Sequence, residues 1–185
     1  MSAARRAFPG FETPAAGFEV PLEMLAACHG RVERQCQTLL RLVPHLAVNG
    51  LDQPAREAAQ NVMRYFDTSA GHHHADEEQD LFPALLRSAP EAELAGLREL
   101  IETLRAQHRI LENTWGQLRA ELEAILQGTK SRLDADAVGR LVDLYRSHIA
   151  REEADLLPLA ARFLEAAQLD AVGRAMRLRR GINDV

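Results

Sequence analysis

Four long segments of this chain carry apolar residues at alternating steps of three and four. At this spacing one stripe of an α-helix can be buried against neighbouring helices. The third segment shows the stripe most regularly, at Leu97, Ile101, Leu104, His108, Leu111, Trp115, Leu118, Leu122 and Ile125. Residues that favour helices are abundant, and only 5% of the chain is aromatic. The pattern predicts an all-α fold, an up-down-up-down four-helix bundle.

Turn and capping residues set the expected ends of the first two helices. The first helix opens at Pro21 and is closed by Gly50. The second opens after Asp52, a residue type that caps helix N-termini, and continues to about Arg87. Because proline removes a backbone donor, a kink is expected at Pro83.

The third and fourth helices follow from the same signals. The third opens after Pro90 and is closed by Gly128. Either Asp134 or Asp136 caps the fourth, which again has a proline, Pro158, near its far end.

The ends of the chain differ from this central part. Residues 1–20 contain two prolines and two glycines and are expected to form an irregular N-terminal arm. Residues 21–185 then form one bundle domain, which suits a chain of 185 residues. A short fifth helix is expected around residues 168–179. The basic stretch 174–180 is interpreted as the solvated end of that helix.

Composition and charge exclude several classes of function. The net charge is −5, so the basic patch of a nucleic-acid-binding protein is not expected. No apolar run approaches the roughly 18 residues of a membrane span, and no apolar core of a signal peptide follows the N-terminus. Cys28 and Cys36 lie two turns apart on one helix, beyond disulfide reach. Reduced thiols of this kind fit a cytoplasmic protein.

Histidines occupy positions in these stripes that should be apolar. His29 and His108 lie in the first and third stripes, and the second and fourth helices carry His73 and His148 on their inward faces. A single buried histidine is more often a core residue held by a hydrogen bond than a ligand. Four unrelated core histidines do not explain why each of the four helices has one on its inward face. The set therefore indicates a shared site.

The second and fourth helices also repeat a motif. Residues 73–83 read H-x-x-x-E-E-x-x-L-F-P, and residues 148–158 read H-x-x-x-E-E-x-x-L-L-P. Residues four apart lie above one another on a helix, so an imidazole and a carboxylate can reach the same metal site. Imidazole suits iron, and a bridging carboxylate neutralises two adjacent cations. The Glu-x-x-His motif of ferritin-like bundles and the H-E-x-x-H motif of metalloproteases are both absent from these segments.

These motifs resemble those of the hemerythrin-like cation-binding (HHE) proteins over roughly residues 21–165. The resemblance implies a helical bundle with a non-haem di-iron centre of two iron ions, oxo-bridged. The implied histidine ligands are His29, His73, His108 and His148. The implied bridging carboxylates are Glu77 and Glu152.

The ligand set departs from that of the oxygen-carrying hemerythrins. Those proteins place two histidines four apart on the third helix, whereas Glu112 follows His108 here. Their last helix carries His and then Asp five residues later, whereas Glu152 follows His148 after four. The set is closer to that of the iron-sulfur-cluster repair proteins of the same superfamily.

Several neighbouring residues have more than one interpretation. His72 and His74 flank His73, and either could be an alternative ligand, contact a ligand or lie on the surface. Glu78 and Glu153 could accept hydrogen bonds from ligand imidazoles or face solvent.

Three further side chains lie close to the inward faces. Surface positions or contacts with ligands are favoured over direct ligation for Glu33 and Glu112. Tyr145 could donate to a bound oxygen species, although packing in the core is favoured.

The function expected from these residues is small-molecule chemistry at iron. Counted as two six-coordinate irons, the set leaves about four positions open for an oxo bridge, water or a small ligand. We therefore expect a protein that binds or responds to oxygen, nitric oxide or peroxide. The alternatives are a di-iron enzyme that removes peroxide or nitric oxide, and iron storage or donation for iron-sulfur cluster repair. A sensor or an iron donor would need a protein partner.

Overall fold

A computed structural model describes residues 17–182, and these residues form helices joined by short connections, without a β-strand. The first helix is α1 (Pro21–Asn49). The second rod is continuous and consists of α2 (Gln53–Tyr65), η1 (Phe66–Ala70), α3 (Gly71–Asp76), η2 (Glu77–Leu81) and α4 (Phe82–Ser88). The third is α5 (Glu91–Leu126), and the fourth consists of α6 (Ala135–Arg151), η3 (Glu152–Leu156) and α7 (Leu157–Phe163). A last helix, α8, spans Ala166–Arg179.

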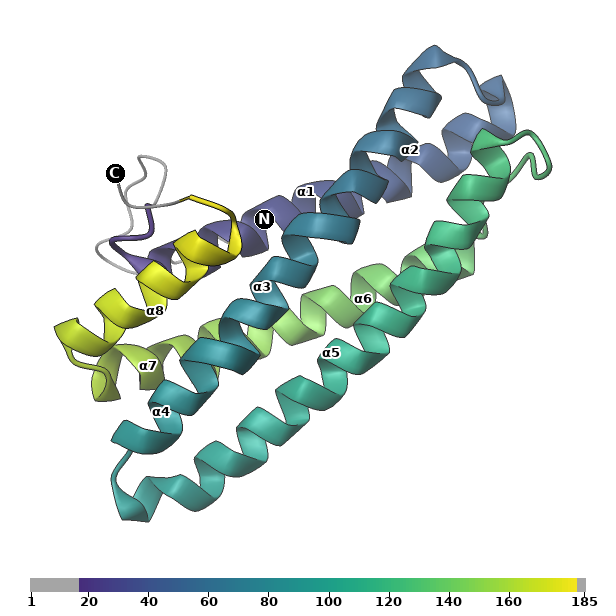
Figure 1. Ribbon diagram of the computed structural model, residues 1–185. Coiled ribbons are helices and arrows are strands. Elements are labelled where there is room, and N and C mark those ends of the chain that lie inside the picture. The colour runs from purple at the N-terminus through teal and green to yellow at the C-terminus, as the bar shows by residue number, and fades with distance from the viewer. Residues whose placement is uncertain (1–16, 183–185) are drawn as a thin grey trace, which may run out of the picture.

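The four rods lie lengthwise beside one another (Figure 1). α1 contacts α6 and α2, and α5 contacts α6, α2 and α4, which closes the bundle. α8 contacts α1 and α3, so it covers one side of the bundle. The prediction of a helical bundle is thus confirmed. No helix in residues 17–182 has the length and apolar character that crossing a bilayer requires.

Local chemistry explains the helix ends. The carboxylate of Asp52 accepts a hydrogen bond from the Ala55 backbone N–H at 2.9 Å. Asp134, rather than Asp136, caps α6 and accepts from two backbone N–H groups in its first turn. Gly50 and Gly128 have positive φ angles of 68° and 75°, a conformation that favours glycine after a helix.

The two prolines of the repeated motif stand just beyond π-helical turns. η2 begins at Glu77 and η3 at Glu152, and in each the glutamate carbonyl accepts from the N–H five residues later. Pro83 and Pro158 have no N–H to donate to a carbonyl four residues back, so the wider turn fits the place where the α-helical ladder is interrupted. At both sites the helix resumes in the next residues, α4 and α7.

The buried apolar side chains form two clusters, one toward each end of the bundle. The first contains residues such as Val32, Leu39, Val62, Leu118 and Leu141. The second contains residues such as Leu25, Phe82, Leu104, Leu156 and Met176. Burying a leucine or valine contributes roughly 1.5–3 kcal/mol, so both clusters stabilise the bundle. In each rod, one part of the chain belongs to the first cluster and another part to the second. Residues 29, 73–77, 108 and 148–152 lie where one cluster gives way to the other.

The C-terminal helix corrects one expectation. Arg179 and Arg180 were expected to be solvated, but both donate to the carboxylate of Asp76, which is fully buried. Arg180 Nη2 lies 2.7 Å from Asp76 Oδ2. A buried carboxylate needs such partners, and this pair fixes α8 to α3. The N-terminal arm predicted for residues 1–20 lies mostly outside the described residues.

Candidate metal centre

The six residues predicted as ligands come together between the two apolar clusters. Each is almost completely buried, with side-chain exposures of 0–3%. They come from all four rods: α1 supplies His29, the second rod His73 and Glu77, α5 His108, and the fourth rod His148 and Glu152.

The carboxylate of Glu77 faces histidines of two different rods. Its Oε1 lies 3.6 Å from His73 Nε2, and its Oε2 lies 3.2 Å from His108 Nε2. The two oxygens of this carboxylate therefore point to two different parts of the centre.

Glu152 divides its oxygens in the same way. Its Oε2 lies 3.0 Å from His29 Nε2 and 3.9 Å from His73 Nε2. Its Oε1 lies 2.9 Å from His148 Nε2 and 3.8 Å from His108 Nε2. Two donors that each sit about 2.1 Å from one cation at right angles are about 3 Å apart, close to these spacings.

The donor atoms form two overlapping groups, each lying within 4.8 Å of one another. One group consists of His29, His73, Glu77 and Glu152. The other consists of His108, His148, Glu77 and Glu152. Each group could hold one cation, and both carboxylates belong to both groups.

Buried polar atoms without a hydrogen-bond partner gather at this centre. In the described part of the chain, the buried side-chain nitrogens and oxygens without a hydrogen-bond partner all belong to these six residues and to His74. They include Nε2 of His29, His108 and His148, and both oxygens of each glutamate. A buried polar atom without a partner costs about 1–3 kcal/mol, and more when it is charged. The donor set therefore fits a cation.

The far side of three histidine rings is held by an acceptor. His29 Nδ1 lies 3.1 Å from Glu153 Oε1, and His108 Nδ1 lies 2.6 Å from Glu78 Oε1. Such bonds place the proton on Nδ1 and direct Nε2 toward the centre. The double glutamate of the repeated motif now has an explanation. In each copy the first glutamate faces the centre, and the second orients the histidine of another rod.

The acceptor for His148 could not be found in the sequence. Its Nδ1 lies 3.0 Å from Gln107 Oε1 on α5. No spacing or motif links these two residues, so only the packing of α5 against α6 reveals the pair. The thiol of Cys28 is a hydrogen-bond partner of His73. Arg31 Nη2 also donates to Cys28 Sγ, at 2.8 Å. Cys28 thus lies among polar groups, although its buried position was expected.

Electrostatic interactions raise the pKa values of two of the histidines that could bind a cation. Burial acts to lower the pKa of His29, but Glu152 and Glu153 outweigh it and raise that pKa to about 9. Burial is likewise outweighed at His108 by Glu152, Glu77 and Glu78, which raise its pKa to about 10. Burial acts to raise the pKa of Glu152, but the surrounding histidines hold it well below its ordinary value. Protons and a metal ion therefore compete for the same atoms.

The structure separates the residues whose roles were left open. His74 is buried, and its donor atom groups with those of His108 and His148. His72 is half-buried and belongs to none of the donor groups found in residues 17–182. Tyr145 is buried and packs its ring 5.4 Å from that of Phe66.

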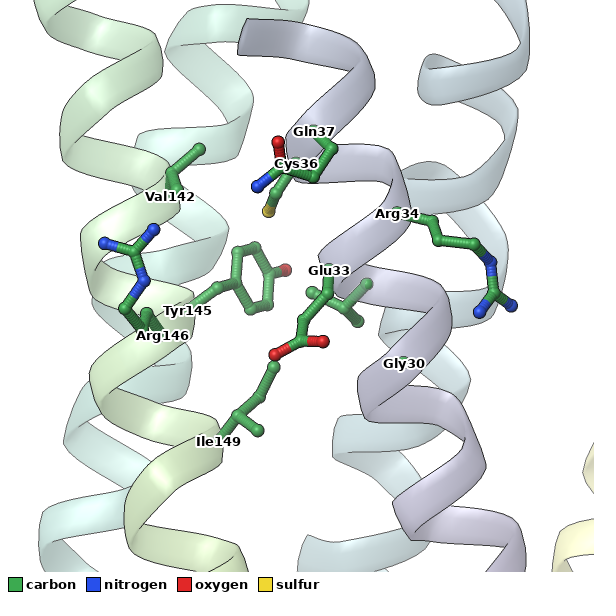
Figure 2. A pocket seen from close by; sticks show the side chains of 10 residues that line it. Gly30, Glu33, Arg34, Cys36, Gln37, Val142, Tyr145, Arg146 and Ile149 are labelled. Atoms are coloured by element: carbon green, nitrogen blue, oxygen red, sulfur yellow. The ribbon is translucent and has the colours of Figure 1, made fainter. Parts of the chain in front are cut away.

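A pocket of about 460 Å³ lies between α1 and α6, next to the centre along both helices. Gly30 and Ile149, which adjoin His29 and His148 in sequence, are part of its wall. Figure 2 shows Tyr145 extending from α6 toward α1, and Glu33 and Cys36 extending from α1. A small molecule could occupy this pocket.

Two comparisons with known proteins match this chain. The family described as the hemerythrin HHE cation binding domain matches residues 20–160. An uncharacterized protein of Haemophilus influenzae (strain Rd) is 33% identical over 164 residues, which are 89% of this chain and 92% of that protein. The family match contains all six predicted ligands.

Proposed function

Because this chain belongs to the hemerythrin HHE cation-binding family, we propose that it is a non-haem di-iron protein that binds or responds to oxygen, nitric oxide or peroxide. Its ligands are the four histidines His29, His73, His108 and His148 and the two glutamates Glu77 and Glu152. The family accounts for cation binding. The number of metal ions, their identity and the small ligand are the content of the proposal.

One observation carries the proposal of two ions. The two oxygens of Glu77 face His73 and His108, and those of Glu152 face His29 and His148. A carboxylate that serves one ion would direct its donors to one set of histidines. Here each carboxylate is shared by two sets, which is the arrangement expected for two bridged cations.

The donor types favour iron. Imidazole with carboxylate suits iron, whereas a structural zinc site takes four ligands and often includes thiolate. Bound iron would supply reversible electron exchange with a small ligand. The chain's own residues hold the donors in place through Glu78, Glu153 and Gln107. The apolar clusters on both sides exclude bulk water from the centre.

The proposal is tested by adding the small ligands to the reduced, iron-loaded protein under anaerobic conditions. Oxygen, nitric oxide and peroxide are added separately, and the absorption spectrum is recorded. We expect a saturable spectral change with at least one of them. If none of the three ligands changes the absorption spectrum, the proposal is wrong.

Two variants show whether the change arises at this centre. Glu77→Ala removes a shared carboxylate and should abolish the change. Glu57→Ala alters an exposed glutamate earlier in the same rod and should leave it intact. Sustained consumption of peroxide or nitric oxide in the same assay would favour the enzymatic alternative over binding alone.

A further inference from the structure

The aromatic side chains that are most easily oxidised lie together on one side of the candidate metal centre. The chain contains one tryptophan, two tyrosines and six phenylalanines. The first of the two apolar clusters includes, or packs against, Trp115, Tyr65 and Tyr145. In the second cluster, the benzene-type rings among the described residues are phenylalanines: Phe18, Phe82 and Phe163. A buried phenol or indole has a polar group that needs a partner, so packing alone would favour phenylalanine on both sides.

One phenylalanine ring, that of Phe66, joins the three oxidisable side chains. Its centroid lies 4.7 Å from that of Trp115 and 5.4 Å from those of Tyr65 and Tyr145. Its plane is 37° from that of Trp115 and 32° from that of Tyr145. The Tyr65 ring instead stands at 84°, edge to face. Because rings that face one another couple electronically better than perpendicular rings, the continuous series runs from Tyr145 through Phe66 to Trp115.

Tyr145 is the inner end of this series. It lies three residues before His148 and seven before Glu152, positions that share one face of a helix. At a rise of 1.5 Å per residue, Tyr145 and His148 are about 4.5 Å apart along the axis. Tyr145 and Glu152 also interact electrostatically. Figure 2 shows the phenol extending into the pocket between α1 and α6. An electron from Tyr145 therefore has a short path to the metal centre.

Trp115 is the outer end. Its indole Nε1 donates to Asp67 Oδ1 at 3.0 Å, and Arg119 Nε donates to Asp67 Oδ2 at 2.9 Å. The side chains of Asp67 and Arg119 are 31% and 40% exposed, so this carboxylate connects the buried indole with the surface. A neighbouring carboxylate favours the positive charge that oxidation creates on an indole. It is also an acceptor for the Nε1 proton.

We propose that Tyr145, Phe66 and Trp115 form an electron-transfer route between the metal centre and the surface at Asp67. The inference rests on the proposed reaction of the di-iron centre with peroxide. Reduction of one hydrogen peroxide to two waters takes two electrons and two protons, and solvent supplies the protons. When only one iron is ferrous, one electron comes from that iron. Tyr145 then supplies the second electron and releases its phenol proton to solvent in the pocket.

The route is then restored from the surface. Trp115 gives one electron through Phe66 to the Tyr145 radical, which regains a proton from solvent. The Nε1 proton of Trp115 passes to Asp67 Oδ1. A small thiolate at the surface reduces the tryptophan radical by one electron, and Asp67 returns the proton to Nε1. The thiolate becomes a thiyl radical, and two thiyl radicals combine to a disulfide.

The first test uses protein loaded with zinc in place of iron, because zinc does not change its oxidation state. Azide radicals generated by pulse radiolysis remove one electron from Trp115, and the absorbances of tryptophan and tyrosine radicals are followed. We expect the tryptophan radical to decay as a tyrosine radical forms, at a rate independent of protein concentration. Tyr145→Phe should lose this transfer, and the matched control Tyr65→Phe should keep it. Transfer that persists in Tyr145→Phe, or that is absent from the unaltered protein, would overturn the route.

The second test follows the radical in the iron-loaded protein. The protein is reduced to one ferrous ion per centre, mixed with hydrogen peroxide, frozen and measured by electron paramagnetic resonance. Because Trp115 is the one tryptophan of the chain, ring-deuterated tryptophan assigns its radical without a variant. We expect a signal that narrows on deuteration and is lost in Tyr145→Phe but kept in Tyr65→Phe. In Trp115→Phe a tyrosine radical should take its place.

The outcomes separate this inference from the proposed function. Oxidation of the iron by peroxide without a tryptophan radical would overturn the route and leave the di-iron proposal standing. If peroxide does not react with the iron, the proposed peroxide chemistry is wrong, and the zinc-loaded protein still decides whether electrons pass between Trp115 and Tyr145. A small thiol should remove the tryptophan radical. A radical that survives the thiol would contradict the surface end of the route.

Discussion

Removal of the carboxylate behind His108 should weaken iron binding without removing any ligand. Glu78 Oε1 lies 2.6 Å from His108 Nδ1, the shortest of the histidine–acceptor distances described above. Loss of such a partner typically costs 10–100-fold in metal affinity, or about 1.4–2.8 kcal/mol. Glu78→Ala should fall in this range. Glu78→Gln keeps an acceptor oxygen and should have a smaller effect.

The second copy of the motif supplies an internal comparison. Glu153 Oε1 lies 3.1 Å from His29 Nδ1, and the Glu153 side chain is 50% exposed against 36% for Glu78. A longer and more solvated bond contributes less, so Glu153→Ala should weaken binding less than Glu78→Ala. Affinities would be measured by anaerobic competition with a chromophoric ferrous chelator, with Glu57→Ala as the control. Binding within twofold of the unaltered protein in Glu78→Ala would refute the reasoning.

Three further predictions concern stability and reactivity. Asp76→Ala should lower the free energy of unfolding by about 3 kcal/mol, because it leaves Arg179 and Arg180 without their buried partner; urea denaturation measures it, and a loss below about 1 kcal/mol would contradict the role of this pair. In the metal-free protein the pKa values of His29 and His108 are raised to about 9 and about 10, so their stabilising protonation is complete below pH 6.5 and is lost as pH rises through those values. The melting temperature of the metal-free protein should therefore fall between pH 7 and pH 10 more steeply than that of the iron-loaded protein, and parallel curves would be the contrary result. Burial raises the pKa of Cys36 to about 12, so alkylation of this thiol in the folded protein at pH 8 should be far slower than in urea, and equal rates would disagree with its burial.

The sequence was informative where the signal was local. Alternating steps of three and four located the long helices, and the i, i+4 spacing of His73 and Glu77 placed both on one helix face. The repeat of the motif then predicted that His148 and Glu152 also share one helix face, and the structure places their side chains 2.9 Å apart. These inferences depend only on helix geometry, which a sequence carries directly.

Contacts between distant segments could not be read in this way. His72 and His74 lie about 100° to either side of His73, and only the packing of the rods buries one of them. Gln107 on α5 contacts His148 on α6, and no sequence motif links these two residues. Arg179 was assigned to solvent because the sequence cannot show that α8 folds back onto α3.

The most direct test of the di-iron centre is metal analysis by mass spectrometry together with an absorption spectrum of the purified protein. We expect about two irons per chain, with charge-transfer bands in the near ultraviolet that are lost in Glu77→Ala. One zinc per chain, or no metal after anaerobic reconstitution with ferrous iron, would contradict the account.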